Sequence, residues 1–300
     1  MASFSGKFNK RSTAEDVVQG LDLSGKRILI TGASSGLGLH SAQVLADRGA
    51  HVLVTARSLE SASEVCSEIG GSTTPLACEL GDPASIRACA ASVLAQGQPL
   101  DVLMCNAGIM ALPKLTVKDG VELQFLTNHF GHFLLTDLLL DAITAAPAGR
   151  VVITSSAAHM TTVGGGINFD NLDGADGYQG WRFYGQSKLA NLLMASELAN
   201  RLAGTPATAY SLHPGVIQTN LGRNMTGLFP IVVSLGAKFI EKTIPQGAAT
   251  QCYLATAPEV TDYTGQYFSN CQPTRTSPYG RDAQLARQLW DVSSEFVAGW

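Results

Sequence analysis

Tyr184 and Lys188 stand four residues apart in the run Tyr184-Gly185-Gln186-Ser187-Lys188. On a helix this spacing places both side chains on one face. A lysine ammonium there favours the phenolate, so it lowers the phenol's pKa from its usual value of about 10. A tyrosine tuned in this way can exchange a proton with the oxygen of an alcohol or a carbonyl. The alternative is an ordinary surface pair on a helix, which is common when such a pair stands alone.

A glycine-rich segment near the start supplies a second pattern, in the run Thr31-Gly32-Ala33-Ser34-Ser35-Gly36-Leu37-Gly38. The apolar run 28–30 precedes it and a stretch with helical spacing follows, so the glycines fall at a strand-to-helix turn. Gly32 permits the tight turn, Gly36 lets the backbone approach phosphates, and Gly38 allows close packing of helix and strand. The amino end of the helix then faces an anion. We therefore expect Ser34, Ser35 and Leu37, with the three glycines, to bind a dinucleotide.

Two polar side chains complete the candidate chemistry. Ser156 follows an apolar run over 150–154, so we expect its hydroxyl at the carboxyl edge of a sheet, hydrogen-bonded to the substrate oxygen. Strand alternation sends the neighbouring Ser155 to the opposite side. Asn128 lies in a stretch with helical spacing, where an amide is mildly unfavourable and a buried one needs partners.

These motifs, taken in order, resemble the short-chain dehydrogenase/reductase family. The resemblance also includes Asn106-Ala107-Gly108 and the run Pro214-Gly215-Val216-Ile217-Gln218-Thr219. Within the family, the runs 127–133, 187–191, 213–215 and 285–290 are similar to the branch of retinol dehydrogenases, WW-domain oxidoreductases and light-dependent protochlorophyllide reductases.

The resemblance implies roles for further residues. Lys188 holds the nicotinamide ribose, and Asn128 holds a water that links Lys188 to solvent. The open alternative for Asn128 is a satisfied amide that packs the helix. Small residues at 106–108 (Asn106, Ala107 and Gly108) let the backbone approach the adenosine ribose. The residues Pro214, Gly215, Val216 and Thr219 contact the nicotinamide carboxamide or the diphosphate.

The choice of cofactor depends on the residue that follows the second apolar run, 52–56. Enzymes that use NAD carry an acidic residue there, whereas this chain has Arg57. A guanidinium suits a 2′-phosphate, so we expect NADP(H) to be preferred over NAD(H). The alternative is a solvated arginine. The family usually has Asp-Leu after the third strand. This chain has Glu79-Leu80, and the longer side chain puts that contact near the adenine in doubt.

The elements that must position these residues are continuous apolar runs alternating with helix-like stretches. Strands are expected at 27–31, 51–55, 74–78, 100–105, 150–154 and 208–212, with another at 265–269. Continuous runs indicate burial on both faces. We therefore expect an α/β fold, a doubly wound parallel Rossmann sheet of about seven strands with helices on both faces, in a single domain over 1–300.

Two segments between these elements are expected to flank the substrate. The stretch 157–180 holds six glycines and predicts a loop. The apolar stretch 221–243 predicts a substrate lid, the alternative being a packed surface helix pair. Apolar residues in and near these segments indicate a bulky, apolar substrate. The expected contacts are His159, Met160, Trp181, Phe183, Met225 and Leu228.

Composition narrows the function classes. Apolar residues make up 45% and charged residues 15%, and the net charge of −4 comes without a basic run, which argues against nucleic acid or an anionic membrane as partner. No apolar run reaches the roughly 20 residues of a membrane span. Residues 1–24 lack the apolar core of a secretory signal, so a cytoplasmic location is expected. The six cysteines lack metal-ligand spacing, so no metal is expected. A homo-oligomer remains open.

The sequence thus predicts an enzyme that interconverts an alcohol with a ketone or aldehyde by hydride transfer, with Tyr184 as proton donor or acceptor. One alternative is a double-bond reductase of the protochlorophyllide type, although 157–183 is short for the extra segment that such enzymes carry. A second is a nucleotide-sensing interaction protein without activity. The presence of all four residues Asn128, Ser156, Tyr184 and Lys188 argues against the second.

Overall fold

The expected apolar runs form the strands of one sheet. The computed structural model describes residues 4, 6–162, 166–217 and 241–300. Its main sheet has eight strands in the order β12-β11-β8-β7-β4-β1-β2-β3. Seven of them are parallel and β12 is antiparallel to β11. The predicted doubly wound parallel sheet is therefore confirmed, with a short antiparallel edge strand added. The strands are β1 (Arg27–Ile30), β2 (His51–Ala56), β3 (Thr73–Ala77), β4 (Val102–Cys105), β7 (Arg150–Thr154), β8 (Thr208–His213), β11 (Tyr267–Ser269) and β12 (Gln272–Pro273).

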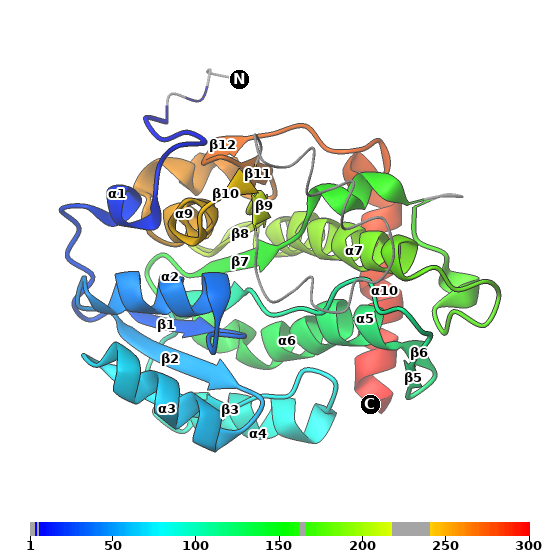
Figure 1. The fold of residues 1–300 in the computed structure, drawn as a ribbon, viewed down its shortest axis with the longest axis horizontal. Coiled ribbons are helices and arrows are strands. Elements are labelled where there is room, and N and C mark those ends of the chain that lie inside the picture. Colours follow the sequence, from blue (N-terminus) through cyan, green and yellow to red (C-terminus); the bar gives the residue numbers. More distant parts are fainter. Residues whose placement is uncertain (1–3, 5, 163–165, 218–240) are drawn as a thin grey trace.

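Helices cover both faces of the sheet (Figure 1). One face of the sheet packs against α2 (Gly36–Ala46), α3 (Leu59–Ile69) and α9 (Ile244–Thr256), and α1 (Ala14–Val18) packs on α9 and α2. The other face packs against α4 (Pro83–Leu94), α6 (Gly131–Thr144) and α7 (Gly180–Arg201), and α10 (Ala283–Gly299) packs on α7 and α6. Each layer closes its own apolar core, and the central strands β1, β4 and β7 are fully buried between the two layers.

Shorter elements connect this framework. The hairpin β5 (Val117–Lys118) and β6 (Val121–Glu122) leads through α5 (Leu123–Phe125) into a π-helical turn, η1 (Leu126–Phe130), which continues as α6. The 3₁₀ turns are η2 (Ala157–Thr161), η3 (Phe169–Asn171), η5 (Pro258–Tyr263) and η6 (Tyr279–Arg281). A second pair joins β9 (Val216–Ile217) to β10 (Glu241–Lys242) in parallel.

The strand order reverses at β1, which lies between β2 and β4. From there the chain adds β2 and β3 on one side, and β4, β7, β8 and β11 on the other. In such sheets ligands bind beyond the carboxyl ends of the strands at this reversal. The glycine turn follows β1 and Asn106 follows β4, so the fold brings these two motifs to the same point.

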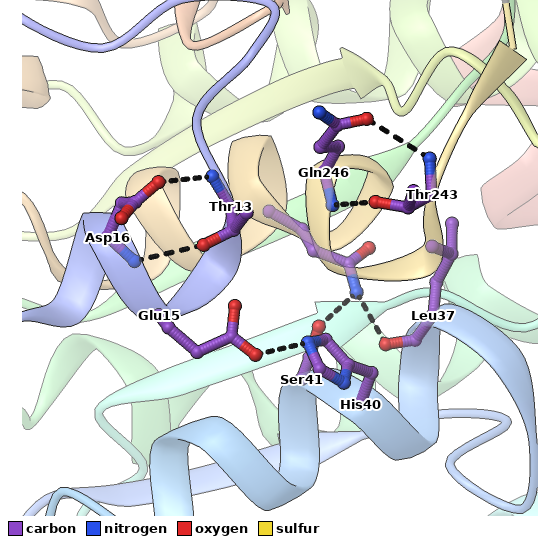
Figure 2. A network of polar contacts seen from close by, with 9 residues as sticks. Thr13, Glu15, Asp16, Leu37, His40, Ser41, Thr243 and Gln246 are labelled. Carbon is purple, nitrogen blue, oxygen red and sulfur yellow. Dashed lines mark hydrogen bonds and ion pairs between the residues drawn. The ribbon is translucent and has the colours of Figure 1, made fainter.

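The amino-terminal segment packs across α2 and α9 (Figure 2). Capping boxes start both α1 and α9, at Thr13 and Thr243. Glu15 of α1 forms an ion pair with His40 of α2 at 2.9 Å. From α9, Gln251 donates to the Ser41 hydroxyl at 2.6 Å and to the Leu37 carbonyl at 3.3 Å. The helix that follows the glycine turn is therefore held from its outer side.

The loop expected over 157–180 is confirmed where it is described, since it contains only the short turns η2 and η3 before α7 begins at Gly180. Most of the lid predicted over 221–243 lies outside the described residues, and its last three residues form β10 and the amino cap of α9. Within the described ranges, none of the helices is long and apolar enough to cross a membrane. The organisation as one domain stays a prediction.

Candidate active site

The glycine turn leaves no room for side chains. Gly32 and Gly36 have φ angles of +65° and +57°, which favour glycine. A Cβ on Gly32 would lie 2.9 Å from the Cβ of Ala107. A Cβ on Gly38 would collide with the Gly32 carbonyl. The turn therefore brings bare backbone to the site, as its spacing predicts.

The amino end of α2 suits an anion. Ser35 is the residue that precedes the helix, and its hydroxyl makes no capping hydrogen bond. The backbone N–H groups of the first turn are thus not capped by that side chain, and they lie at the positive end of the helix dipole. Ser34 and Ser35 are exposed, while Leu37 is half-buried. These residues fit a diphosphate, since the cradle combines a helix start with glycines that a side chain would fill.

Asn106 shapes this turn from the neighbouring strand. Its amide nitrogen donates to the carbonyls of Thr31 at 2.9 Å and Gly32 at 3.3 Å. In return the Thr31 hydroxyl accepts the backbone N–H groups of Asn106 at 2.9 Å and Ala107 at 3.0 Å. The ends of β1 and β4 are therefore tied by side chains as well as by the sheet.

Tyr184 and Lys188 lie on one face of α7, as the spacing predicts, and both are buried. The Lys188 ammonium lies 5.7 Å from the centre of the Tyr184 ring and donates to the Thr154 carbonyl at 3.0 Å. Burial lowers the pKa of Lys188 to about 8. Lys188 therefore still carries most of its charge at neutral pH.

Burial decides the pKa of Tyr184. It raises the pKa to about 12, and the hydrogen bond with Ser156 opposes this only in part. The sequence predicts a pKa lowered by Lys188, but in the structure the pKa is raised, because a phenolate in a buried site is costly. The protein's own side chains therefore hold Tyr184 as a neutral phenol, which is the form that can donate a proton.

The two serines after β7 have different partners. The Ser155 hydroxyl is buried and donates to the Lys188 carbonyl at 2.6 Å, so it fastens the strand end to α7. The Ser156 hydroxyl accepts the Ala158 N–H at 3.2 Å, and it is near enough to Tyr184 to lower the pKa of that phenol. Only Ser156 thus reaches the phenol, in agreement with the alternation of side chains along a strand.

Asn128 lies in the π-helical turn η1 and is fully buried. Its side-chain oxygen accepts the Ile109 N–H at 2.8 Å. Its nitrogen donates to the Ile109 carbonyl and to the Ser187 hydroxyl, both at 2.9 Å. The amide therefore clamps the loop after Gly108 to α7. This geometry favours the packing role, one of the two open possibilities, for the side chain.

Gly108 keeps the space between these groups open. A Cβ there would lie 3.1 Å from the Asn128 side-chain oxygen and 3.4 Å from the Lys188 nitrogen. Both distances are tight, so the absence of a side chain lets a ligand approach Lys188 from the β4 side.

Arg57 directly follows β2 and is exposed. It forms no ion pair or hydrogen bond with any residue that the structure describes, so its guanidinium can turn toward a ligand. The Glu79 carboxylate accepts the Gly81 N–H at 3.1 Å within its own turn, and Leu80 is buried against Gly131. Glu79 and Leu80 thus shape a turn, and neither is placed by these contacts toward an adenine.

The segment after β8 carries the remaining cofactor candidates. Gly215 has a φ of +106°, and a Cβ there would lie 2.6 Å from the Lys242 stem. Lys242 therefore lies across the turn formed by Pro214 and Gly215. Val216 is 41% exposed in β9. Thr219 lies outside the described residues.

The expected substrate contacts fall in different places. The ring of Trp181 lies 5.6 Å from Tyr184, and the buried Phe183 packs against Tyr178. Met160 is exposed. Met225 and Leu228 lie outside the described residues.

His159 is placed differently from the prediction. Its side chain is fully enclosed, its Nδ1 donates to the Ser156 carbonyl at 2.7 Å, and its Nε2 accepts the Ser277 N–H at 3.3 Å. The ring packs edge-on against Tyr267. Because both nitrogens are used by backbone groups, His159 supports Ser156 from behind, and its contacts among the described residues are with protein groups.

One hydrogen-bonding residue was missed by reasoning from the sequence. His132 is fully buried and touches both Thr31 and the Asn128 carbonyl. Its signal was a histidine within an apolar helical stretch, where a buried imidazole needs two partners. In the described part of the chain, no cluster of three or more histidine, cysteine or acidic residues could hold a metal ion.

Comparisons with known proteins agree with this geometry. The sequence profile of the short chain dehydrogenase family matches residues 26–170. The chain is 42% identical over 302 residues to the short-chain dehydrogenase TIC 32 A, chloroplastic, of Brassica napus, with 97% of this chain and 94% of that protein covered. It is 38% identical to retinol dehydrogenase 14 of Homo sapiens over 297 residues, which cover 92% of this chain and 87% of that protein.

A solved structure shows the same fold. An uncharacterized protein from Mycobacterium Paratuberculosis matches with a TM-score of 0.74 and 33% identity, covering 94% of this chain and 97% of that one. The chain belongs to the short-chain dehydrogenase/reductase family, and it is an oxidoreductase of that family.

Proposed function

We propose that the protein is an NADP(H)-dependent oxidoreductase that interconverts an alcohol with a ketone or aldehyde on an apolar, bulky substrate. One observation carries this proposal: Tyr184 and Lys188 are buried on one face of α7, with the Lys188 ammonium 5.7 Å from the centre of the Tyr184 ring and hydrogen-bonded to the Thr154 carbonyl at the carboxyl end of β7. This is the edge of the sheet where the glycine turn presents bare backbone.

A bound nicotinamide supplies or takes up the hydride. For reduction, Tyr184 gives its phenolic proton to the substrate oxygen as negative charge develops there. Ser156 donates a hydrogen bond to the same oxygen and so stabilises that charge. Lys188, still largely protonated, then favours the phenolate that Tyr184 leaves behind. In the oxidative direction the same three groups act in reverse.

The preference for NADP(H) is supported by Arg57. Its guanidinium stands after β2 with no partner among the described residues, and β2 carries no acid at its end. A 2′-phosphate would give it paired, charge-assisted hydrogen bonds, whereas a free 2′-hydroxyl would not. The diphosphate would lie at the start of α2, near Ser34 and Ser35.

The substrate class is supported by the surroundings of Tyr184 and by the names of relatives. Trp181 lies against Tyr184 and exposed Met160 belongs to the turn that follows Ser156. Several relatives are named retinol dehydrogenases, which supports an alcohol as the substrate. We therefore infer a preference for large apolar alcohols and carbonyls over small polar ones. A cytoplasmic location and a homo-oligomer stay predictions.

A panel of alcohols and carbonyls of increasing apolar size, retinol included, tests the proposal. Each is assayed by the absorbance of reduced nicotinamide with NADPH, NADH and their oxidised forms, beside Tyr184→Phe as the inactive control. Turnover that needs Tyr184, favours NADPH and rises with apolar size is the expected result. Turnover with NADH alone would contradict the cofactor assignment. If no compound in the panel is turned over, or if Tyr184→Phe turns the compounds over as fast as the wild type, the proposed reaction is wrong.

A further inference from the structure

His132 joins two parts of the site that are far apart in sequence. It lies in the first turn of α6, and its side chain is fully buried. Its Nε2 is 2.8 Å from the Thr31 hydroxyl, at the end of β1. Its Nδ1 is 2.9 Å from the Asn128 carbonyl oxygen, in the π-helical turn. One ring therefore touches the entry to the glycine turn and the residue that clamps α7.

The partners fix the protonation of this ring. A carbonyl oxygen can only accept, so Nδ1 carries the hydrogen. Burial lowers the pKa of His132 to about 4, so the ring is neutral at neutral pH and Nε2 is an acceptor. The Thr31 hydroxyl then donates to Nε2. Its oxygen accepts the backbone N–H groups of Asn106 and Ala107 at 2.9 and 3.0 Å.

The result is a directed chain of hydrogen bonds. It begins at the N–H groups that follow β4, passes through Thr31 to His132, and ends at the backbone carbonyl of Asn128. The side chain of the same Asn128 makes a separate hydrogen bond to Ser187, the neighbour of Lys188, so a residue fixed by His132 also contacts α7. Chains of this kind in a buried site polarise and orient their members.

A second buried histidine, His129, lies three residues before His132, and its ring makes no hydrogen bond with Thr31 or with the Asn128 carbonyl. Burial of a histidine alone therefore does not link these two groups. His129 is also fully enclosed, and burial lowers its pKa to about 3. Its Nε2 lies 2.8 Å from the Ser293 hydroxyl of α10, and it packs among Phe125, Phe130 and Phe133. His129 therefore holds α10 to the framework, and its other polar neighbour is Asn191 of α7, so its ring bonds neither Thr31 nor the Asn128 carbonyl.

We propose that His132 is a positioning residue for the reaction. Through Nε2 and Thr31 it holds the glycine turn, and through Nδ1 it holds Asn128, whose amide clamps the loop after Gly108 to α7. The proposal rests on the proposed function, because it assumes that cofactor binds at the glycine turn and that Lys188 acts in the chemistry.

Two substitutions separate the two tasks. An asparagine amide nitrogen reaches about the place of Nδ1, so His132→Asn keeps the donor to Asn128 and loses the acceptor for Thr31. A glutamine amide oxygen reaches about the place of Nε2, so His132→Gln keeps the acceptor for Thr31 and loses the other bond. For His132→Asn we expect the Kd of NADPH to rise about threefold to tenfold, with kcat within about twofold. For His132→Gln we expect kcat to fall about threefold to tenfold, with Kd within about twofold.

His129→Asn and His129→Gln are the matched controls. They remove one hydrogen bond from the same turn, so they lower the melting temperature but leave the Kd of NADPH and kcat within about twofold of the wild type. If the two His132 variants shift Kd and kcat together, or no more than the His129 pair does, His132 is only structural and the proposal is wrong.

A second pair keeps the test independent of turnover and of the folding of the His132 variants. Thr31→Ser keeps the hydroxyl and Thr31→Val removes it. We expect NADPH titration to show a higher Kd for the valine variant only, and ¹⁵N NMR of the wild type to show His132 protonated at Nδ1. Equal Kd values for both, or a hydrogen on Nε2, would overturn the proposal. A wild type that binds no cofactor would instead contradict the proposed function.

Discussion

The glycine turn and the catalytic face of α7 lie at the same sheet edge but are built in opposite ways. The turn consists of backbone, and it excludes side chains: a Cβ on Gly32 or Gly38 would meet protein atoms directly. The face of α7 depends on two functional groups whose pKa values are shifted by burial, Tyr184 upward and Lys188 downward. The turn therefore depends on shape, which the pattern of glycines reveals, and the helix face depends on its environment, which the sequence does not state.

Replacing the phenol should have the largest effect. Tyr184→Phe removes the proton donor and leaves the ring, so we expect kcat to fall by roughly 10²–10⁴-fold. The Kd of the cofactor should stay within about twofold, because the glycine turn is untouched. Steady-state kinetics and cofactor titration measure the two quantities. Near-normal turnover in this variant would mean that another group delivers the proton.

Removing the buried cation should separate stability from activity. At pH 7, Lys188→Met abolishes the charge, and we expect turnover to be lost. The same change should raise the free energy of unfolding by on the order of 1–3 kcal/mol, since a pKa lowered from 10.5 to about 8 means that burial opposes the charged form. The Thr154 carbonyl keeps the hydrogen bond from Asn191 at 3.0 Å.

The difference in unfolding free energy between Lys188→Met and the wild type should depend on pH. The unfolded chain binds the extra proton between pH 8 and 10.5, so wild-type stability rises there relative to Lys188→Met. The advantage of the variant should be full below about pH 8 and disappear above 10.5. Urea unfolding of both proteins across this range measures it. A difference that does not change with pH would show that Lys188 is not destabilised by its burial.

Cofactor binding at the glycine turn should be sensitive to the size of the residue at position 38. Gly38→Ala adds one methyl group that collides with the Gly32 carbonyl, so we expect strain of about 1–3 kcal/mol and a cofactor Kd raised roughly tenfold to a hundredfold. Gly299→Ala is the control, because a Cβ there meets nothing within 4 Å. Calorimetric titration of both variants makes the comparison. Equal affinities would show that the turn can move aside.

Much of the fold follows from patterns that the chain carries locally. Continuous apolar runs such as 28–30 and 151–153 give the buried parallel strands, and the glycines mark the turn after β1. The four-residue spacing gives the shared face of Tyr184 and Lys188. The antiparallel strand β12 contains only Gln272 and Pro273, too few residues to show any alternation.

The details of the site depend on contacts that no local pattern records. The pKa of Tyr184 moves upward because the folded protein encloses it, which outweighs the opposing effect of Ser156. His159 lies behind Ser156 because the loop at Ser277 and the ring of Tyr267 enclose it. His132 connects Asn128 with Thr31, which lies 101 positions before His132 in the sequence. Such partners become visible only when the chain is folded.

Arg57 tests whether the two regions are independent. Its proposed role is to bind the 2′-phosphate, and it has no part in proton transfer. Arg57→Ala should therefore weaken NADPH binding, by about tenfold. This is the lower end of the energy range for a charge-assisted hydrogen bond, because the side chain is exposed. NADH binding and the kcat with saturating NADPH should change little. Arg275→Ala is the control for net charge, since Arg275 is also exposed but follows β12 at the opposite edge of the sheet. Equal losses for NADPH and NADH would refute the role of Arg57. A fall in kcat at saturation would show that the 2′-phosphate contact also orients the reacting end, and the two regions would then be coupled.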